Sequence, residues 1–145
     1  MEKNLRLLLI GLLLCVAGLY HYTDKQSDFY QKNLTPTLLL ILEDIAQWQP
    51  AVLRQHLSLE ASKVITDQQL DKLMLQYRPL GVLHSADQLV FSKLMSVLSL
   101  VGPERVNYAG EVDFANGKAD LNITLAKQND QWKIFNLNLS NISSQ

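Results

Sequence analysis

Residues that could do acid–base or metal chemistry are few in this sequence, and they lie far apart. The three histidines are His21, His56 and His84, and none has a carboxylate or cysteine at metal-ligand spacing such as HExxH. His84 is followed by Ser85 and Asp87, a combination that could carry out acid–base work beside a cleft. A loop histidine among polar residues is more often simply solvated. The sequence therefore predicts no catalytic residue, no metal site and no cofactor.

Charge and cysteine content narrow the function classes further. The 145 residues include 13 Lys and Arg against 14 Asp and Glu, and these are scattered rather than gathered in a basic stripe. Nucleic-acid binding is therefore not expected. The single cysteine, Cys15, lies in an N-terminal apolar run, so the folded part has neither a disulfide nor thiol chemistry. The length fits one domain with a core that needs no cross-link or metal.

The elements that could position a site are clearest in the C-terminal third, where the sequence predicts a three-stranded meander. Residues 106–114 and 119–125 alternate apolar and polar around Asn116-Gly117, the dipeptide typical of a two-residue hairpin turn. A three-residue turn at 128–130, with Asn129 or Asp130 left-handed, leads to a third strand from Trp132 to about Leu139.

These two turns predict a register that places the apolar residues of all three strands on one face. A slip of one residue would turn the whole set to solvent, so the register is strongly specified. The expected pairs are Phe114 with Ala119, Val112 with Leu121, Gly110 with Ile123 and Tyr108 with Leu125, then Ile123 with Phe135, Leu121 with Leu137 and Ala119 with Leu139.

The apolar face offers no carboxylate or histidine, and its candidate pocket-lining residues are Tyr108, Phe114 and Phe135. Tyr108 could donate a hydrogen bond to a ligand carbonyl. A tyrosine in such a place more often packs its ring in the core and points its hydroxyl at solvent or backbone.

The opposite face is mostly polar and carries one apolar patch, made of Trp132, Ile134 and Ala126. An exposed aromatic residue beside an aliphatic one is a natural anchor for a protein partner. The alternative is that another part of the chain, such as 88–101, covers this patch.

Two carboxylates are expected to oppose each other on the same polar face. The predicted register places Asp113 opposite Asp120, and like charges directly opposed are unfavourable. A bound cation would relieve the repulsion. The plainer interpretation is an exposed hairpin tip, where water and Lys118 screen the charges.

The N-terminus has the features of a membrane anchor or a signal peptide. Lys3 and Arg6 precede an apolar run, and residues Leu7 to Tyr22 would contact the membrane. The run is short for a bilayer core, which needs about 20 residues, and it suits a signal peptide cleaved near Gly18. Alternatively, His21 and Tyr22 at the membrane interface would let a short helix span a thin bilayer. This uncleaved anchor is the preferred interpretation. In both cases the positively charged residues before the apolar run stay in the cytoplasm, and in a bacterium the domain after it lies in the periplasm. If the segment is not cleaved, it tethers that domain to the inner membrane by a single pass.

Between this segment and the meander, the sequence predicts a polar linker and several helices. The linker covers 23–34, and Thr35-Pro36 has the form of an N-cap and a first helical residue. Pro50 should break that helix, and a capping box at 66–69 should open another. Residues 80–85 are compatible with a short strand, and 88–101 stays open between helix and strands.

Several short sequence segments occur in a characteristic order along the chain. A helix ends in Ile45-Ala46-Gln47-Trp48, Tyr77-Arg78-Pro79-Leu80-Gly81-Val82-Leu83 precedes the sheet, Tyr108-Ala109 leads to Phe114-Ala115-Asn116-Gly117-Lys118-Ala119, and Trp132-Lys133-Ile134 opens the last strand. In these features residues 36–141 resemble the nuclear-transport-factor-two-like, or cystatin-like, superfamily, and in particular its small exported or membrane-anchored bacterial members. The resemblance implies an α+β fold, with an N-terminal apolar helix and helices packed on a curved antiparallel sheet that forms a cone. Members of the superfamily include isomerases and dehydratases, dimerising adaptors, and membrane-anchored periplasmic parts of secretion machines.

Two functions follow as expectations for a chain divided into an anchor at 1–22, a linker at 23–34 and a cystatin-like domain at 35–145. The first is a non-enzymatic, membrane-tethered periplasmic domain that binds a protein partner or forms a homodimer. The alternative is a pocket inside the cone that binds a small molecule or works like an isomerase or dehydratase. The lack of an acid–base set on the inner face favours the first.

Overall fold

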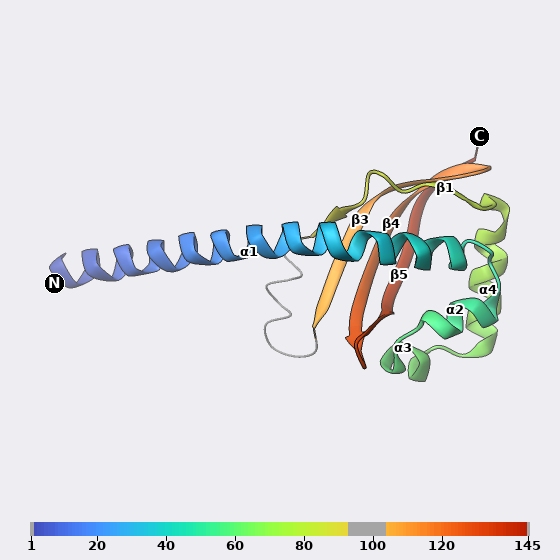
Figure 1. Cartoon of the computed structure of the whole chain (residues 1–145), viewed down its shortest axis with the longest axis horizontal. Helices are drawn as coiled ribbons and strands as arrows, with labels where there is room; N and C mark the ends of the chain where they lie inside the picture. Colours follow the sequence, from blue (N-terminus) through green and yellow to red (C-terminus); the bar gives the residue numbers. More distant parts are fainter. Residues whose placement is uncertain (1, 93–103, 145) are drawn as a thin grey trace.

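The computed structural model describes residues 2–92 and 104–144. Within these ranges it describes the backbone alone for 2–9, 19–27 and 144. Within that part the fold is α+β, with helices packed on an open five-stranded antiparallel sheet (Figure 1). The helices are α1 (Glu2–Ile45), α2 (Pro50–His56), α3 (Leu59–Val64), α4 (Asp67–Tyr77) and the 3-10 helix η1 (Arg78–Leu80). The strands are β1 (Leu83–Ser85), β2 (Val90–Phe91), β3 (Arg105–Phe114), β4 (Gly117–Gln128) and β5 (Gln131–Ser144). The sheet order is β1-β3-β4-β5, and β2 also pairs with β3.

Several local predictions are confirmed. The first helical region breaks before Pro50, which is the first residue of α2. The Thr66 side chain accepts from the Gln69 N–H, and the Gln69 side chain accepts from the Thr66 N–H, so the capping box opens α4 as expected. The short strand β1 lies within 80–85. Of the segment 88–101, β2 is a strand and residues 93–101 lie outside the described part.

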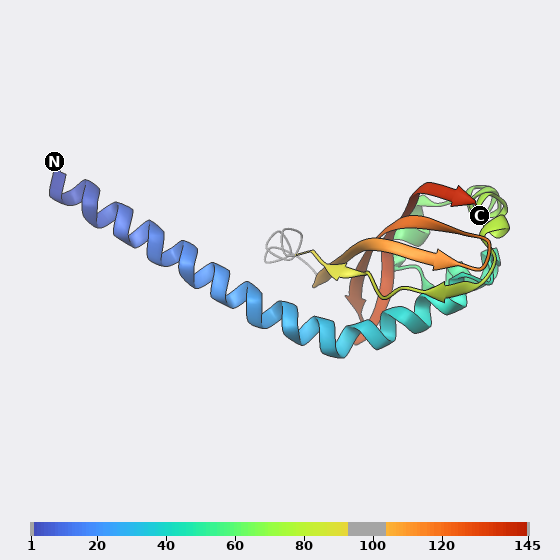
Figure 2. The same cartoon turned by 90° about the horizontal axis from the view of Figure 1, so that it is seen from above.

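Helix α1 differs most from the prediction, because residues 23–34 are helical and the helix does not begin at Thr35-Pro36. Pro36 lies inside α1, where it removes one main-chain hydrogen bond. Burial on one side offsets that cost: Tyr30, Leu34 and Leu38 follow at helical spacing and are 7%, 3% and 0% exposed. Figures 1 and 2 show this part of α1 lying across one face of the sheet. Among the described residues, no helix is long and apolar enough to cross a membrane.

The first hairpin forms on the expected face, but its register differs from the prediction by two residues. Phe114 pairs with Gly117 and not with Ala119. The two loop residues between them donate their N–H groups to the carbonyls of Val82 and Leu80, both at 2.9 Å. These tertiary hydrogen bonds outweigh the turn preference of Asn-Gly. Because the shift is even, the same side chains still point to the core.

The second hairpin has a two-residue loop where three residues were expected. Asn129 and Asp130 have φ angles of 50° and 59°, so both are left-handed, and Gln128 pairs with Gln131. This is the backbone of the primed turns that fit the twist of a hairpin.

A bulge in β5 then returns the residues beyond it to the faces of the sheet that were predicted for them. Leu125 pairs with Ile134, but Thr124 pairs with Asn136, so Phe135 is an extra residue in the strand. Beyond the bulge, Ile123 pairs with Leu137 and Leu121 with Leu139, each two residues away from the predicted partner, so the predicted face is kept.

The three long strands nevertheless share one apolar face, and this central prediction is confirmed. Val112, Ile123 and Leu125 are 0% exposed and lie with Leu137 on the side that α1 covers. Helix α4 adds Leu70 and other buried side chains to the same core. The sheet and helices thus enclose one continuous hydrophobic cluster.

Candidate functional site

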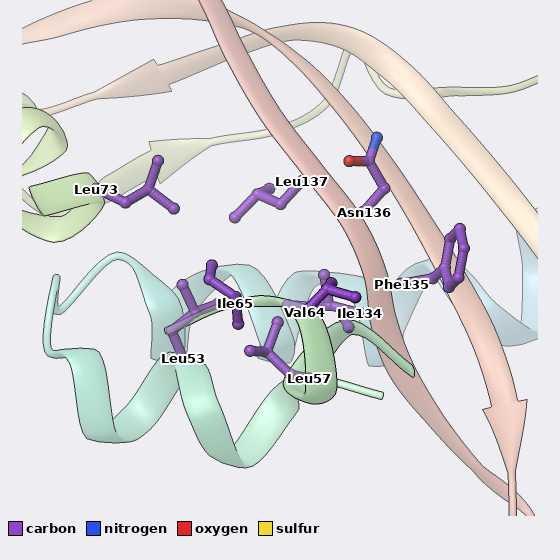
Figure 3. A pocket seen from close by; sticks show the side chains of 10 residues that line it. Leu53, Leu57, Val64, Ile65, Leu73, Ile134, Phe135, Asn136 and Leu137 are labelled. Atoms are coloured by element: carbon purple, nitrogen blue, oxygen red, sulfur yellow. The ribbon is translucent and has the colours of Figure 1, made fainter. Parts of the chain in front are cut away.

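The described residues form an apolar groove where helices α2, α3 and α4 meet strand β5 (Figure 3). Its volume is about 190 Å³. Asn136 is the one polar side chain in its lining, and no lining residue is charged. The lining residues are Leu53, Leu57, Ala61, Val64, Ile65, Leu73, Ile134, Phe135, Asn136 and Leu137.

Short helices and their caps build the helical wall of the groove. Ser58 caps α3 by accepting a hydrogen bond from the Ala61 N–H at 3.1 Å. Ile65 stands directly before the N-cap of α4, a place where an apolar residue commonly packs back on the helix. These caps direct Val64 and Ile65 toward the strand, and Val64 remains 79% exposed at the rim.

Main-chain and side-chain hydrogen bonds fasten this wall to the edge of the sheet. The Ser58 N–H donates to the carbonyl of Ile134 at 2.8 Å, and Leu57 forms a parallel bridge with the same residue. The Lys133 Nζ donates to the carbonyl of Gln55 at 3.0 Å. The end of α2 and the start of β5 are therefore held together, while the strand continues past them toward Leu137.

Phe135, the extra residue at the bulge of β5, also lines the groove. The Arg105 guanidinium lies 3.9 Å from the centre of the Phe135 ring, and it also donates to Glu60 Oε2 at 2.8 Å. This contact orients the ring with a cation–π attraction and ties β3, β5 and α3 together.

The predicted partner patch of Trp132, Ile134 and Ala126 is not an exposed surface. Ile134 is 0% exposed and Ala126 is 7% exposed. Trp132 is half-buried, and its ring packs edge-on against Tyr30 of α1 at 6.1 Å between centres. The two-residue loop brings Trp132 and Ile134 round to the helix-covered face, which the three-residue loop would not have done.

The expected inner pocket is filled by its own side chains. Tyr108 is 1% exposed and donates its hydroxyl to the carbonyl of Tyr30 at 3.0 Å, and burial raises the pKa of this hydroxyl. Phe114 packs against the Trp48 ring at 5.5 Å, whereas Phe135 lies outside, at the groove. The cavity beside Trp48 and Phe114 has a volume of about 10 Å³, which is near the minimum for one water molecule.

The two opposed aspartates are also separated by the register shift. Asp113 pairs with Lys118 across the hairpin, and Asp120 pairs with Glu111. The Lys118 Nζ lies 2.9 Å from Glu111 Oε1 and 3.0 Å from Asp113 Oδ1. The hydrogen bond to Glu111, followed by that to Asp113, raises the pKa of Lys118. The lysine thus takes the place that a cation would have had.

Of the three histidines, His21 lies outside the described side chains, and His56 and His84 belong to no shared cluster. His56 Nε2 lies 2.9 Å from Asp44 Oδ2, and His84 is exposed. Among the side chains that the structure describes, no three or more of His, Cys, Asp or Glu gather as a metal site would require.

The groove itself was missed by the sequence reasoning. Val64, Ile65 and Leu73 are apolar residues at the ends and on one side of two short helices, and this pattern indicates packing rather than an open surface. Only the bulge at Phe135 and the α2–α3 connection decide that a space is left between them. The chain matches no family model, no curated protein and no solved structure.

Proposed function

We propose that this chain is a non-enzymatic, membrane-tethered periplasmic domain that binds a protein partner through the groove beside β5. The observation that carries the proposal is the groove of about 190 Å³, lined by apolar side chains next to the outermost strand of the sheet. Contiguous apolar surface that a fold leaves uncovered is typical of interaction sites.

The chemistry of the lining supports binding rather than catalysis. Its only polar side chain is Asn136, so it offers neither a nucleophile nor an acid–base pair. Small-molecule sites usually combine an apolar lining with several convergent polar groups that fix orientation. An apolar groove with a single amide is better suited to receive aliphatic or aromatic side chains of another protein.

The tether is supported by the sequence at the N-terminus. Lys3 and Arg6 stand before the apolar run, and Ile10, Leu13 and Leu14 within it are 58%, 72% and 67% exposed. A helix with such residues on its surface needs a membrane or a partner to cover them. Anchoring would raise the effective concentration of the groove for any neighbour in the same membrane.

Kinship with the cystatin-like superfamily is part of the same proposal. Its support is the combination of a helix lying across one face of an antiparallel sheet with the meander of β3, β4 and β5. In the proposed kinship the sheet is the curved wall of a cone, and the space inside it is filled by the chain's own side chains.

Site-specific cross-linking in native membranes tests the proposed function. A photo-cross-linking amino acid replaces Val64, which is 79% exposed at the groove, or Leu75, which is 61% exposed on α4 outside the groove lining. The full chain should form an adduct with another protein from position 64 and none from position 75. No adduct from position 64, or equal adducts from both positions, would refute the proposal.

The tether has its own measurement. After alkaline extraction, the full chain should stay in the membrane pellet with an intact mass that includes Lys3 and Arg6. Recovery in the soluble fraction with a mass that begins after Gly18 would show a cleaved signal peptide instead.

A further inference from the structure

Strand β5 has an open edge beside the groove, and the register shows which of its residues face outward. Gln128 and Gln131 close a two-residue loop, so they form a hydrogen-bonded pair. Hydrogen-bonded and non-hydrogen-bonded pairs alternate along an antiparallel ladder. Beyond the bulge, Asn136 therefore bonds to β4, while Leu137 and Leu139 direct their N–H and C=O groups away from it.

Contacts within the chain confirm this direction and limit the open part of the edge. The carbonyl of Ile134 accepts from the Ser58 N–H at 2.8 Å, and the carbonyl of Leu139 accepts from the Tyr77 hydroxyl at 3.3 Å. Between them, the outward N–H and C=O of Leu137 have no hydrogen-bond partner among the described residues. Leu137 also lines the groove.

The exposed edge lacks the charges that natural sheets use to prevent pairing. From Ile134 to Ser144 the strand contains no charged residue and no proline. Its irregularities are the bulge at Phe135 and a second break in register between the partners of Lys118 and Asp120. The stretch between these two is regular and uncharged, so its open part at Leu137 is a ready template for another strand.

We propose that the partner binds as an extended segment that adds to β5, pairs with the main chain of Leu137 and places an apolar side chain in the groove. This inference rests on the proposed function and specifies its mode of binding. The Leu57–Ile134 bridge already pairs one segment with this edge, and an incoming strand would continue the same row. Because the groove lining carries no charge, the inserted side chain must be uncharged, and the main-chain bonds supply affinity for many sequences.

A second copy of the chain fits this edge less well than a different protein. Antiparallel pairing of two β5 edges requires a two-fold axis perpendicular to the sheet. Because α1 lies across the sheet face, that axis would turn the two α1 helices in opposite directions (Figure 1). Two chains anchored by their N-termini in one membrane cannot satisfy this geometry.

A matched pair of substitutions tests the main-chain pairing in the full chain. Leu137→Pro and Leu137→Ala both remove the leucine side chain, but only proline also removes the outward N–H. The ladder to β4 stays intact, since proline is tolerated where the N–H faces away from the sheet. With the photo-cross-linker at position 64, the adduct yield should be about tenfold lower in Leu137→Pro than in Leu137→Ala, the effect of one lost hydrogen bond whose partner is left unpaired.

The outcomes separate this inference from the proposed function. Equal yields in the two variants would overturn strand addition while leaving a groove-binding module in place. No adduct even in the chain with native Leu137 would overturn both. An adduct with the mass of two chains would identify a second copy as the occupant and overturn the inference.

Hydrogen exchange provides a second measurement that does not depend on the folding of the proline variant. In the full chain with native Leu137 and no partner bound, the amide hydrogen of this residue should exchange rapidly with solvent. It should exchange at least about tenfold more slowly in the cross-linked complex, because it has become hydrogen-bonded. Unchanged exchange of this amide would overturn the inference.

Discussion

Replacing Ile134 by alanine tests whether the two-residue loop before β5 turns this side chain into the core. Ile134 is 0% exposed and contacts the α2–α3 connection. The substitution removes about 2.4 kcal/mol of transfer free energy, at about 0.8 kcal/mol for each buried carbon group. Incomplete collapse of the resulting cavity adds to this, so the free energy of unfolding should fall by about 3–4 kcal/mol.

The same strand supplies a matched control. Ile142 is 44% exposed, so Ile142→Ala should lower the free energy of unfolding by about 1 kcal/mol. Both variants are measured by equilibrium urea unfolding of the full chain in detergent micelles, with the fluorescence of buried Trp48 as the signal. If Ile134→Ala costs less than about 0.5 kcal/mol, as an exposed residue would, the two-residue loop and the register described for the start of β5 are wrong.

Further expected outcomes concern backbone fit, ionisation and turn geometry. Gly110→Ala should lower the free energy of unfolding by about 3 kcal/mol, because its Cβ would lie 2.2 Å from the main-chain oxygen of Gln88. An unchanged melting temperature would show that the main chain of Gln88 does not pack against Gly110. Burial raises the pKa of Tyr108 above 10.0, so its contribution to stability is full below that pH and is lost as pH rises through the raised value. Urea unfolding at about pH 9 and about pH 11 should therefore show a larger loss in the native chain than in Tyr108→Phe, and equal losses would contradict the burial of an ionisable hydroxyl. Asp130→Gly should raise stability by about 0.5 kcal/mol, because glycine adopts the left-handed turn without steric cost; a lower melting temperature would contradict the two-residue turn.

The candidate site shows where pattern reasoning fails. The patch of Trp132, Ile134 and Ala126 followed logically from a three-residue loop, but one residue less in the loop moved Ile134 to the buried face. Alternation assigns residues to the two faces of a strand only until the first bulge. The alternation of residues does not mark the bulge at Phe135, so no count along β5 could have located the groove.

The sequence alone determined the α+β class, the apolar face shared by three strands, the helix break at Pro50 and the capping box at Thr66. Each of these depends on neighbours in the chain, through periodicity, backbone restriction or a local hydrogen bond.

The tertiary structure decided the length of α1, the register of both hairpins and the open edge beside the groove. In α1, burial of Tyr30 and Leu34 against the sheet outweighs the hydrogen bond lost at Pro36. In the first hairpin, the carbonyls of Val82 and Leu80 hold the loop one residue before the Asn116-Gly117 turn that it would otherwise prefer, which shifts the register by two. These are energies between residues far apart in the chain, and only the folded arrangement brings them into contact.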